Sequence, residues 1–159
     1  MFDISVLQKD LMKALKAVEP TVGKNSQGLG DNCLSMICDT TGCVTLSTTN
    51  TFEFTKVNII ANATTQSTAP LVDFKRFKGI VASIPETEYI TIKQNVNDLL
   101  ISFSMKKPIR LSGCSNGTVP YPSVTPAQTI TIPTTILKEI IKAANSILKE
   151  STATPIYNC

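Results

Sequence analysis

Residues 67–85 read STAPLVDFKRFKGIVASIP, a short strand pattern that runs directly into an amphipathic helix pattern. Asp73 is a candidate N-cap, because its carboxylate can accept a hydrogen bond from the first-turn backbone. Phe77 and its apolar neighbours recur at helical spacing, and a proline then ends the pattern. The sequence therefore predicts a strand over 67–72 and a helix over 73–83.

The same opening, a strand pattern followed by a helix pattern, occurs near Phe2, Ser67 and Gln128. Three further strand patterns follow each of the first two openings, whereas the third reaches Cys159 before any such strand. Repetition of this kind predicts an α+β fold of β-α-β-β-β repeats, with two helices on one face of the sheets and a truncated third repeat. The expected strands are 2–6, 33–38, 44–47, 52–59, 67–72, 89–93, 99–103, 108–111 and 129–132, and the expected helices are 7–22, 73–83 and one that begins at Thr134.

Three prolines between 115 and 126 exclude regular structure there and favour an extended connector. We therefore expect one complete domain over 1–115, a connector over 116–126, and the truncated start of a second domain over 127–159.

Composition narrows the class of protein. The chain has 159 residues, five cysteines and no histidine, and its mean hydropathy is +0.12. It holds no signal peptide pattern and no apolar run long enough to cross a membrane, so we expect a soluble, cytoplasmic protein without membrane contact. An odd number of cysteines without a secretory signal favours reduced thiols. Cys33, Cys38 and Cys43 lack the C-x2-C spacing of metal sites, so we interpret them as core thiols and expect no metal and no other cofactor.

The basic residues concentrate in the expected helices. Nine of the 15 lysines and arginines lie there against four acidic residues, which gives the helices a net charge of +5 and the rest of the chain −2. A lysine-rich solvent face is ordinary for any single amphipathic helix, and that interpretation stays open. Three equivalent helices with the same bias instead indicate a shared surface for the phosphate backbone of a nucleic acid, without base readout. The residues expected to contact it are Lys9, Lys13, Lys16, Lys75, Lys78, Lys138, Lys142 and Lys149.

Four segments of this sequence match one known family in order and spacing. The run LVDFKRFKGIVASIP at 71–85 resembles the second helix of the bacterial DNA sliding clamp, the beta subunit of DNA polymerase III, with its "F..IV..LP" ending. VPYPS at 119–123 is similar to the clamp's domain connector. Residues 134–144 resemble the helix that opens its second domain, and TPIY at 154–157 resembles the segment after that helix. The resemblance covers essentially the whole chain, as the clamp's first domain and the opening of its second.

Three features depart from the family pattern. LGDNC at 29–33 replaces the family's LPIL, Thr154 stands where an arginine is frequent, and the isoelectric point of about 8.6 contrasts with the family's acidic one. The first two weaken the assignment of loops that contact DNA.

The resemblance implies a non-catalytic processivity factor for DNA replication. Such a ring encircles duplex DNA, tethers the replicative DNA polymerase, is loaded by a clamp loader, and is a homo-oligomer, a dimer in the family. By position, Arg76, Ile109 and Leu111 correspond to subunit contacts, and Lys24 lies near a loop that contacts DNA. The family's peptide pocket lies between its second and third domains, so no residue of this chain is assigned to it.

The residues themselves bear on other classes of function. Without histidine, Ser–His and Cys–His catalytic pairs are impossible, and the carboxylates of Glu86 and Glu88 lie in an expected turn, so an enzyme is not expected. A β-rich structural or assembly protein and a small sequence-independent DNA-binding module remain alternatives. Retention on closed circular DNA would separate a clamp from a simple DNA-binding module.

Overall fold

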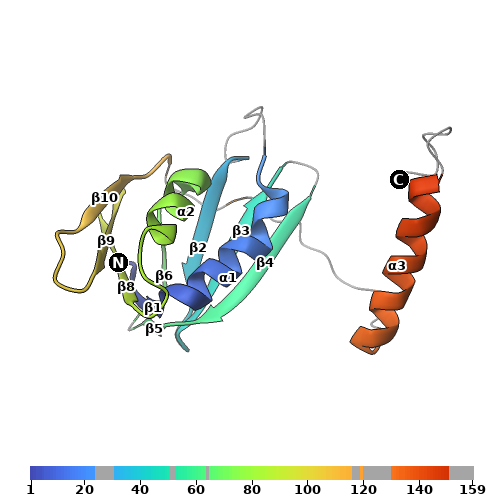
Figure 1. Cartoon of the computed structure of the whole chain (residues 1–159). Coiled ribbons are helices and arrows are strands. Elements are labelled where there is room, and N and C mark those ends of the chain that lie inside the picture. Colours follow the sequence, from blue (N-terminus) through green and yellow to red (C-terminus); the bar gives the residue numbers. More distant parts are fainter. Residues whose placement is uncertain (24–30, 51–52, 64, 116–118, 120–129, 151–159) are drawn as a thin grey trace. The chain divides into compact units, whose positions relative to one another are not determined.

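The computed structural model in Figure 1 divides into two units, Met1–Tyr121 and Pro122–Cys159. The description covers residues 1–23, 31–50, 53–63, 65–115, 119 and 130–150, without the side chains of 147–150.

The first unit contains two β-α-β-β-β repeats. The first consists of β1 (Asp3–Leu7), α1 (Gln8–Val18), a 3-10 turn (Glu19–Thr21), β2 (Cys33–Cys38), β3 (Cys43–Thr49) and β4 (Phe54–Ile60). The short strand β5 (Asn62–Ala63) connects it to the second, which consists of β6 (Ser67–Thr68), β7 (Val72–Asp73), α2 (Phe74–Ala82), β8 (Tyr89–Asn95), β9 (Asp98–Phe103) and β10 (Ile109–Ser112).

The two repeats exchange their opening strands. β1 pairs antiparallel with β8, with Ile4 opposite Ile92, in a sheet of order β10-β9-β8-β1-β5. β6 and β7 pair antiparallel with β2, where Leu34 lies opposite Val72, beside the β4-β3-β2 ladder of the other sheet. Each repeat therefore supplies a strand to the sheet of the other, and neither repeat forms its complete sheet alone.

Helices α1 and α2 contact each other and lie on the same side of the sheets (Figure 1). Their apolar faces and the inward-facing residues of both sheets form one core. Its largest fully buried side chains include Phe2, Phe74, Phe77, Leu11, Leu15, Leu34, Leu46, Ile90 and Ile92. Burial of each such side chain contributes about 1.5–3 kcal/mol, so this shared core is the main favourable term in folding.

Hydrogen bonds from other elements satisfy the ends of both helices. The Thr48 hydroxyl on β3 donates to the carbonyl of Val18, the last residue of α1, at 2.7 Å. At the start of α2, the Asp73 carboxylate accepts from the Arg76 amide at 2.8 Å, so the predicted N-cap is confirmed. The Gln8 side-chain amide donates to the Val81 carbonyl at 3.0 Å and ties the two helices together.

The two hairpins that follow the helices use different turn residues. Between β2 and β3, Gly42 has φ +81°, and an added Cβ would lie 2.7 Å from the Ala61 carbonyl oxygen. Between β8 and β9, Val96 holds φ 57° with an exposed, β-branched side chain. Left-handed backbone costs a non-glycine residue roughly 1–2 kcal/mol, so only the first of these turns has the residue that its conformation favours.

The second unit contains helix α3 (Thr134–Glu150). Its start at Thr134, after Pro133, is as predicted. The strand expected over 129–132 is wrong for 130–132, which form no strand, and Thr129 lies outside the described residues.

One further strand prediction and one helix prediction differ in detail. The strand expected over 67–72 is divided into β6 and β7. The Ala69 amide still donates to the Met36 carbonyl of β2, but Pro70 has no amide donor and interrupts the pairing. The first helix ends at Val18, and the chain continues as a 3-10 turn with a proline in it.

Candidate nucleic-acid interface

Helix α1 carries three lysines on one exposed face. Lys9, Lys13 and Lys16 follow an i, i+4, i+7 spacing, which places them along one stripe of a helix, and all three are exposed. The opposite stripe, with Leu11 and Leu15, is buried in the core. In the part of the chain that the structure describes, none of the three lysines has a carboxylate within ion-pair distance. The stripe is a compact positive surface that is free to meet an anion.

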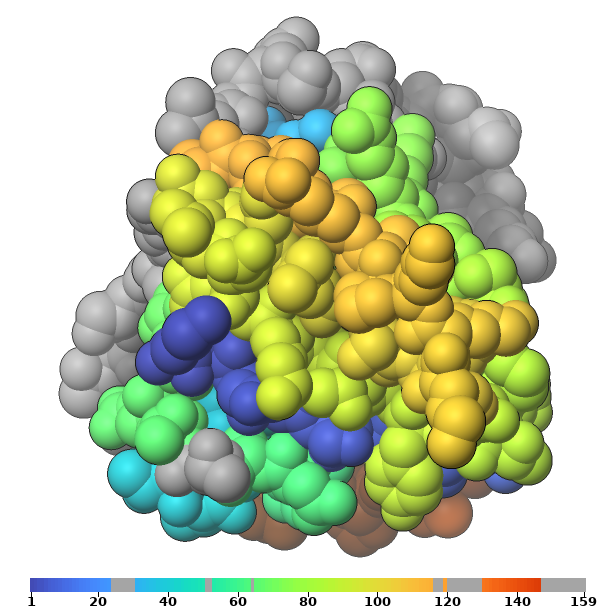
Figure 2. All heavy atoms as spheres, turned by 90° about the vertical axis from the view of Figure 1, so that its left-hand side faces the viewer, coloured from blue at the N-terminus to red at the C-terminus, as the bar shows by residue number. Residues whose placement is uncertain are grey.

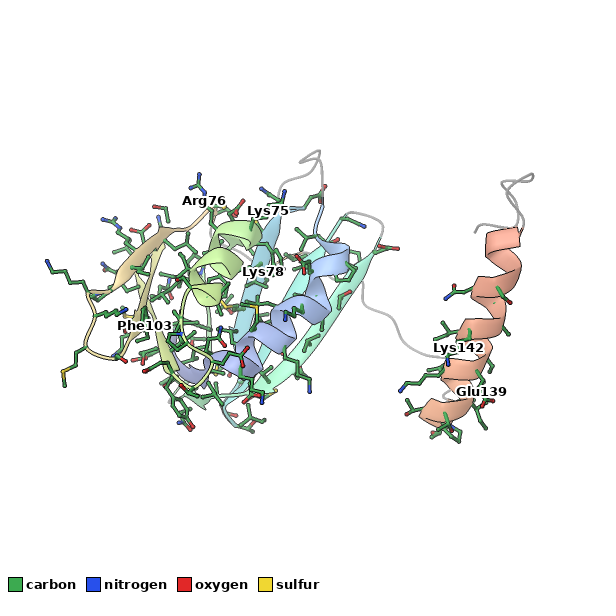
Figure 3. All side chains as sticks on the ribbon, in the orientation of Figure 1. Lys75, Arg76, Lys78, Phe103, Glu139 and Lys142 are labelled. Carbon is green, nitrogen blue, oxygen red and sulfur yellow. The ribbon has the colours of Figure 1, made fainter. Side chains whose placement is uncertain are left out.

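Helix α2 carries three cations and no acidic residue. Lys75 and Arg76 lie exposed in its first turn, as the side chains in Figure 3 show. Lys78 differs from both, because its ammonium nitrogen lies 2.5 Å from a carboxylate oxygen of Glu19, at the end of α1. Its side chain is 27% exposed and that of Glu19 is 47% exposed.

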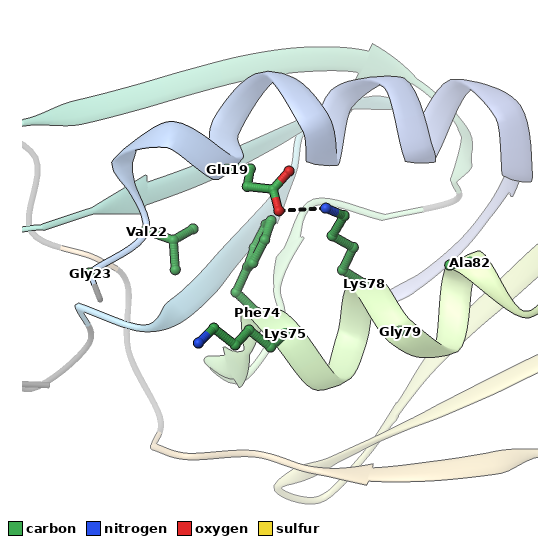
Figure 4. A pocket seen from close by; sticks show the side chains of 8 residues that line it. All are labelled: Glu19, Val22, Gly23, Phe74, Lys75, Lys78, Gly79 and Ala82. Carbon is green, nitrogen blue, oxygen red and sulfur yellow. Dashed lines mark hydrogen bonds and ion pairs between the residues drawn. The ribbon is translucent and has the colours of Figure 1, made fainter. Parts of the chain in front are cut away.

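An open groove of about 680 Å³ lies between the end of α1 and the outer face of α2 (Figure 4). Val22, Phe74 and Ala82 contribute apolar surface to it, Lys75 contributes a cation, and the Glu19–Lys78 ion pair lies on its wall.

Helix α3 presents two of the predicted lysines. Lys138 and Lys142 are one helical turn apart and exposed, and Figure 3 shows Lys142 beside Glu139 on this helix. The side chain of Lys149 and the whole of Lys24 lie outside the described residues. The aliphatic residues of the other stripe are exposed as well, at Ile136, Leu137, Ile140 and Ile141.

The residues matched to subunit contacts have different environments. Arg76 is exposed on α2, and Ile109 is half-buried on β10, the edge strand of its sheet. Leu111 is only 6% exposed and packs in the core, so its side chain supports β10 from inside. Figure 2 shows the outer face that β8, β9 and β10 cover, in yellow to orange. On it, Arg110 of β10 forms an ion pair with Asp98 of β9.

The described cysteines are free thiols. Burial raises the pKa of Cys33 to about 12, and its contact with Cys114 and the nearby carboxylate of Asp73 act in the same direction. Burial also raises the pKa of Cys38. Hydrogen bonds from Thr41 lower the pKa of Asp39, whose carboxylate accepts from three groups in its turn.

The described residues show neither a metal-binding cluster nor a membrane-spanning helix. They contain no group of three or more His, Cys, Asp or Glu side chains that could hold a metal ion. None of the helices among them is long and apolar enough to cross a membrane.

Sequence reasoning placed Lys9, Lys13 and Lys16 on one face and missed the ion pair between Glu19 and Lys78. No sequence signal joins these two residues, because they lie 59 positions apart and meet only when α1 and α2 pack together. The register of the two helices decides which of their charges can meet.

No protein-family model and no curated protein matches this sequence. Solved structures do match the fold. DNA polymerase III subunit beta from Pseudomonas aeruginosa superposes with a TM-score of 0.77 at 16% identity, over 89% of this chain and 38% of that one. A Helicobacter pylori beta clamp bound to a DNA ligase peptide matches with a TM-score of 0.68 at 16% identity, over 79% and 34% of the two chains. Caulobacter crescentus pol III beta gives 0.69 at 15% identity, over 77% and 32%.

This chain therefore spans roughly a third of the length of the clamps that it matches. The fold expected from the resemblance is confirmed: two exchanged β-α-β-β-β repeats, with both helices on one side of the sheets, form the fold of a bacterial DNA sliding clamp.

Proposed function

We propose that this chain is part of a sliding clamp, a non-catalytic processivity factor that encircles duplex DNA during replication in the cytoplasm. The observation that carries the proposal is the lysine stripe of α1, because it lies on the exposed helical face of a clamp fold. Cations spaced along a helix attract the phosphate backbone of any sequence, which is the kind of contact that a moving ring requires.

The proposed DNA-contacting set is the α1 stripe with Lys75, supplemented by Lys138, Lys142 and Lys149 of α3 and by Lys24. The replicative polymerase and the clamp loader are the proposed partners of the complete ring. We also propose that the first domain covers residues 1–115, that residues 116–126 are the connector, and that the second domain begins at residue 127.

For the subunit contact we propose the β10 edge, with Arg76 and Ile109 on the surface and Leu111 supporting the strand from the core. An edge strand presents unpaired backbone donors and acceptors, which a neighbouring subunit can satisfy.

Binding to duplex DNA across a salt series tests the charge part of this proposal. The double substitution Lys13→Gln with Lys16→Gln removes two stripe cations, and we expect it to make the slope of log affinity against log salt shallower by about 1.8. A matched double substitution, Lys106→Gln with Lys107→Gln, removes the same charge from the exposed β9–β10 loop and should leave the slope nearly unchanged. Equal effects of the two pairs would contradict the proposed face.

Retention on nicked circular DNA, before and after linearisation, tests the ring part. A ring that encircles DNA stays on the circle and is lost from the linear form. Equal retention on both forms would favour a small DNA-binding module, and no response to DNA at all would favour a structural or assembly protein.

A further inference from the structure

We propose that Lys78 does not contact DNA and that Glu19 is the positioning residue that holds it away, so that the DNA-facing charge of α2 is limited to its first turn. This inference rests on the proposed function, since it concerns which cations of the same surface meet the phosphate backbone. It separates Lys78 from the other lysines that the sequence grouped with it.

The register of the two repeats separates Lys78 from the lysine stripe. When α1 and α2 are aligned by their first residues, Lys75 takes the position of Lys9. The two later stripe positions of α1, Lys13 and Lys16, correspond on α2 to Gly79 and Ala82, and Lys78 corresponds to Met12. Met12 is half-buried against the core. Lys78 therefore projects from the flank of its helix and not from the equivalent exposed face.

At this flank position Lys78 forms an ion pair. Lys78 reaches back to α1, and its nitrogen meets the Glu19 carboxylate at 2.5 Å, across the groove between the helices (Figure 4). The other cations of the two helices have no such partner among the described residues. The pair leaves no net charge at this point of the surface.

Glu19 is poorly placed for the stability of its own helix. It is the C-cap residue of α1, where the negative end of the helix dipole disfavours a carboxylate and favours a cation. A residue that opposes its local structure is explained by a contact elsewhere, and the contact here is Lys78. Because both side chains are partly exposed, the pair itself stabilises the fold only slightly. Its main effect is on the charge presented to a ligand.

This arrangement keeps one cation from phosphate. Each phosphate that a protein neutralises changes the slope of log affinity against log salt by about 0.9 on duplex DNA. A protein that slides along DNA benefits from a small number of phosphate contacts that break easily. Glu19 removes one potential phosphate contact, that of Lys78, from the proposed DNA-facing surface of α1 and α2.

The test compares salt slopes of duplex DNA binding for the whole chain and five variants. We expect Glu19→Gln to free Lys78 and steepen the slope by about 0.9, Lys78→Gln to leave it unchanged, and Lys75→Gln to make it shallower by about 0.9. Asp10→Asn is the matched control, because it removes an exposed carboxylate of α1 that has no ion-pair partner among the described residues. It should leave the slope unchanged, and Glu19→Asp should restore the wild-type slope.

Amine labelling followed by mass spectrometry supplies a readout that does not depend on DNA. In the wild-type chain Lys78 should be labelled several-fold more slowly than Lys75, and in Glu19→Gln the two rates should converge. Equal rates in the wild type would overturn the inference, as would a Lys78→Gln slope as shallow as that of Lys75→Gln, or an Asp10→Asn slope as steep as that of Glu19→Gln. Normal labelling without any DNA binding would instead refute the proposed function.

Discussion

The two repeats of the first unit have the same topology and different surfaces. Both consist of an opening strand, a helix and three antiparallel strands, and each gives its opening strand to the sheet of the other. The first repeat has three lysines along its helix that have no carboxylate partner among the described residues, whereas the second has Lys75 followed by Gly79 and Ala82 at the corresponding positions. The comparison shows that the pattern of buried apolar residues determines the fold, whereas the exposed helix positions of the two repeats can differ in charge.

The difference extends to the turns. The first repeat turns at Gly42, and its Asp39 carboxylate accepts three hydrogen bonds from the same turn. The second repeat turns at Val96, in a conformation that disfavours valine. Equal topology therefore does not require equal local stability.

The largest effect is expected in the core, where the two repeats should behave alike. Leu11 of α1 and Phe77 of α2 occupy equivalent, fully buried positions. We expect Leu11→Ala to lower the free energy of unfolding by about 2–5 kcal/mol and Phe77→Ala by about 3–5 kcal/mol. Because the strands are exchanged, urea unfolding of either variant should remain a single transition when followed by circular dichroism and fluorescence. Two separate transitions would break the comparison, since they would show that one repeat unfolds without the other.

The next effect concerns the turn of the first repeat. Gly42→Ala should lower the free energy of unfolding by about 2–3 kcal/mol, because alanine is strained at this positive φ and its Cβ would approach the Ala61 carbonyl. Gly79→Ala is the matched control in the second repeat, since no atom lies within 4 Å of an added Cβ on this helix position. It should raise the free energy of unfolding by about 0.5–1 kcal/mol. Chemical denaturation of the two variants measures both, and a loss of equal size in each would contradict the role given to Gly42.

A smaller effect is expected at the corresponding turn of the second repeat. Val96→Gly should raise the free energy of unfolding by about 1 kcal/mol, because it relieves a left-handed β-branched residue whose side chain is 77% exposed and loses little packing. Differential scanning calorimetry would detect this as a higher Tm. A lower Tm would show that Val96 contributes packing that outweighs its backbone strain.

The smallest effect depends on pH. In the first repeat β2 begins with the buried Cys33, and in the second β8 begins with the exposed Tyr89. Since burial raises the pKa of Cys33 from 9.0 to about 12, the folded state holds a proton that the unfolded state releases above pH 9. The stability that this thiol contributes is therefore present below pH 9 and is lost as the pH rises toward 12.

The measurement is the difference in free energy of unfolding between the wild type and Cys33→Ala. We expect this difference to shrink between about pH 9 and about pH 12, in the direction given by the pKa shift. A difference that stays constant over this range would mean that the thiol does not titrate differently in the two states.

Much of this fold could be predicted from the sequence, because its signals are local. The period of apolar residues identified α1 and α2, Asp73 identified a helix start, and Cys33–Cys38 was placed at its observed bounds. The division of 67–72 into two short strands was missed, since the pattern hid the break at Pro70. The sequence also could not reveal that Glu19 meets Lys78 or that Leu111 turns inward, because both depend on how distant elements pack.

The exchanged strands have a consequence for the order in which the protein forms during synthesis. The ribosome makes β1 first, but its longest partner, β8, appears only after α2 has been completed, and Ile4 has to wait for Ile92. The ladder of β2, β3 and β4 joins near neighbours and can form early, whereas the sheet that holds β1 closes late, because contacts between distant residues are slow to form. During that interval the nascent chain exposes strand β1 and the apolar residues that the second repeat will later cover. The chain is then most prone to aggregation.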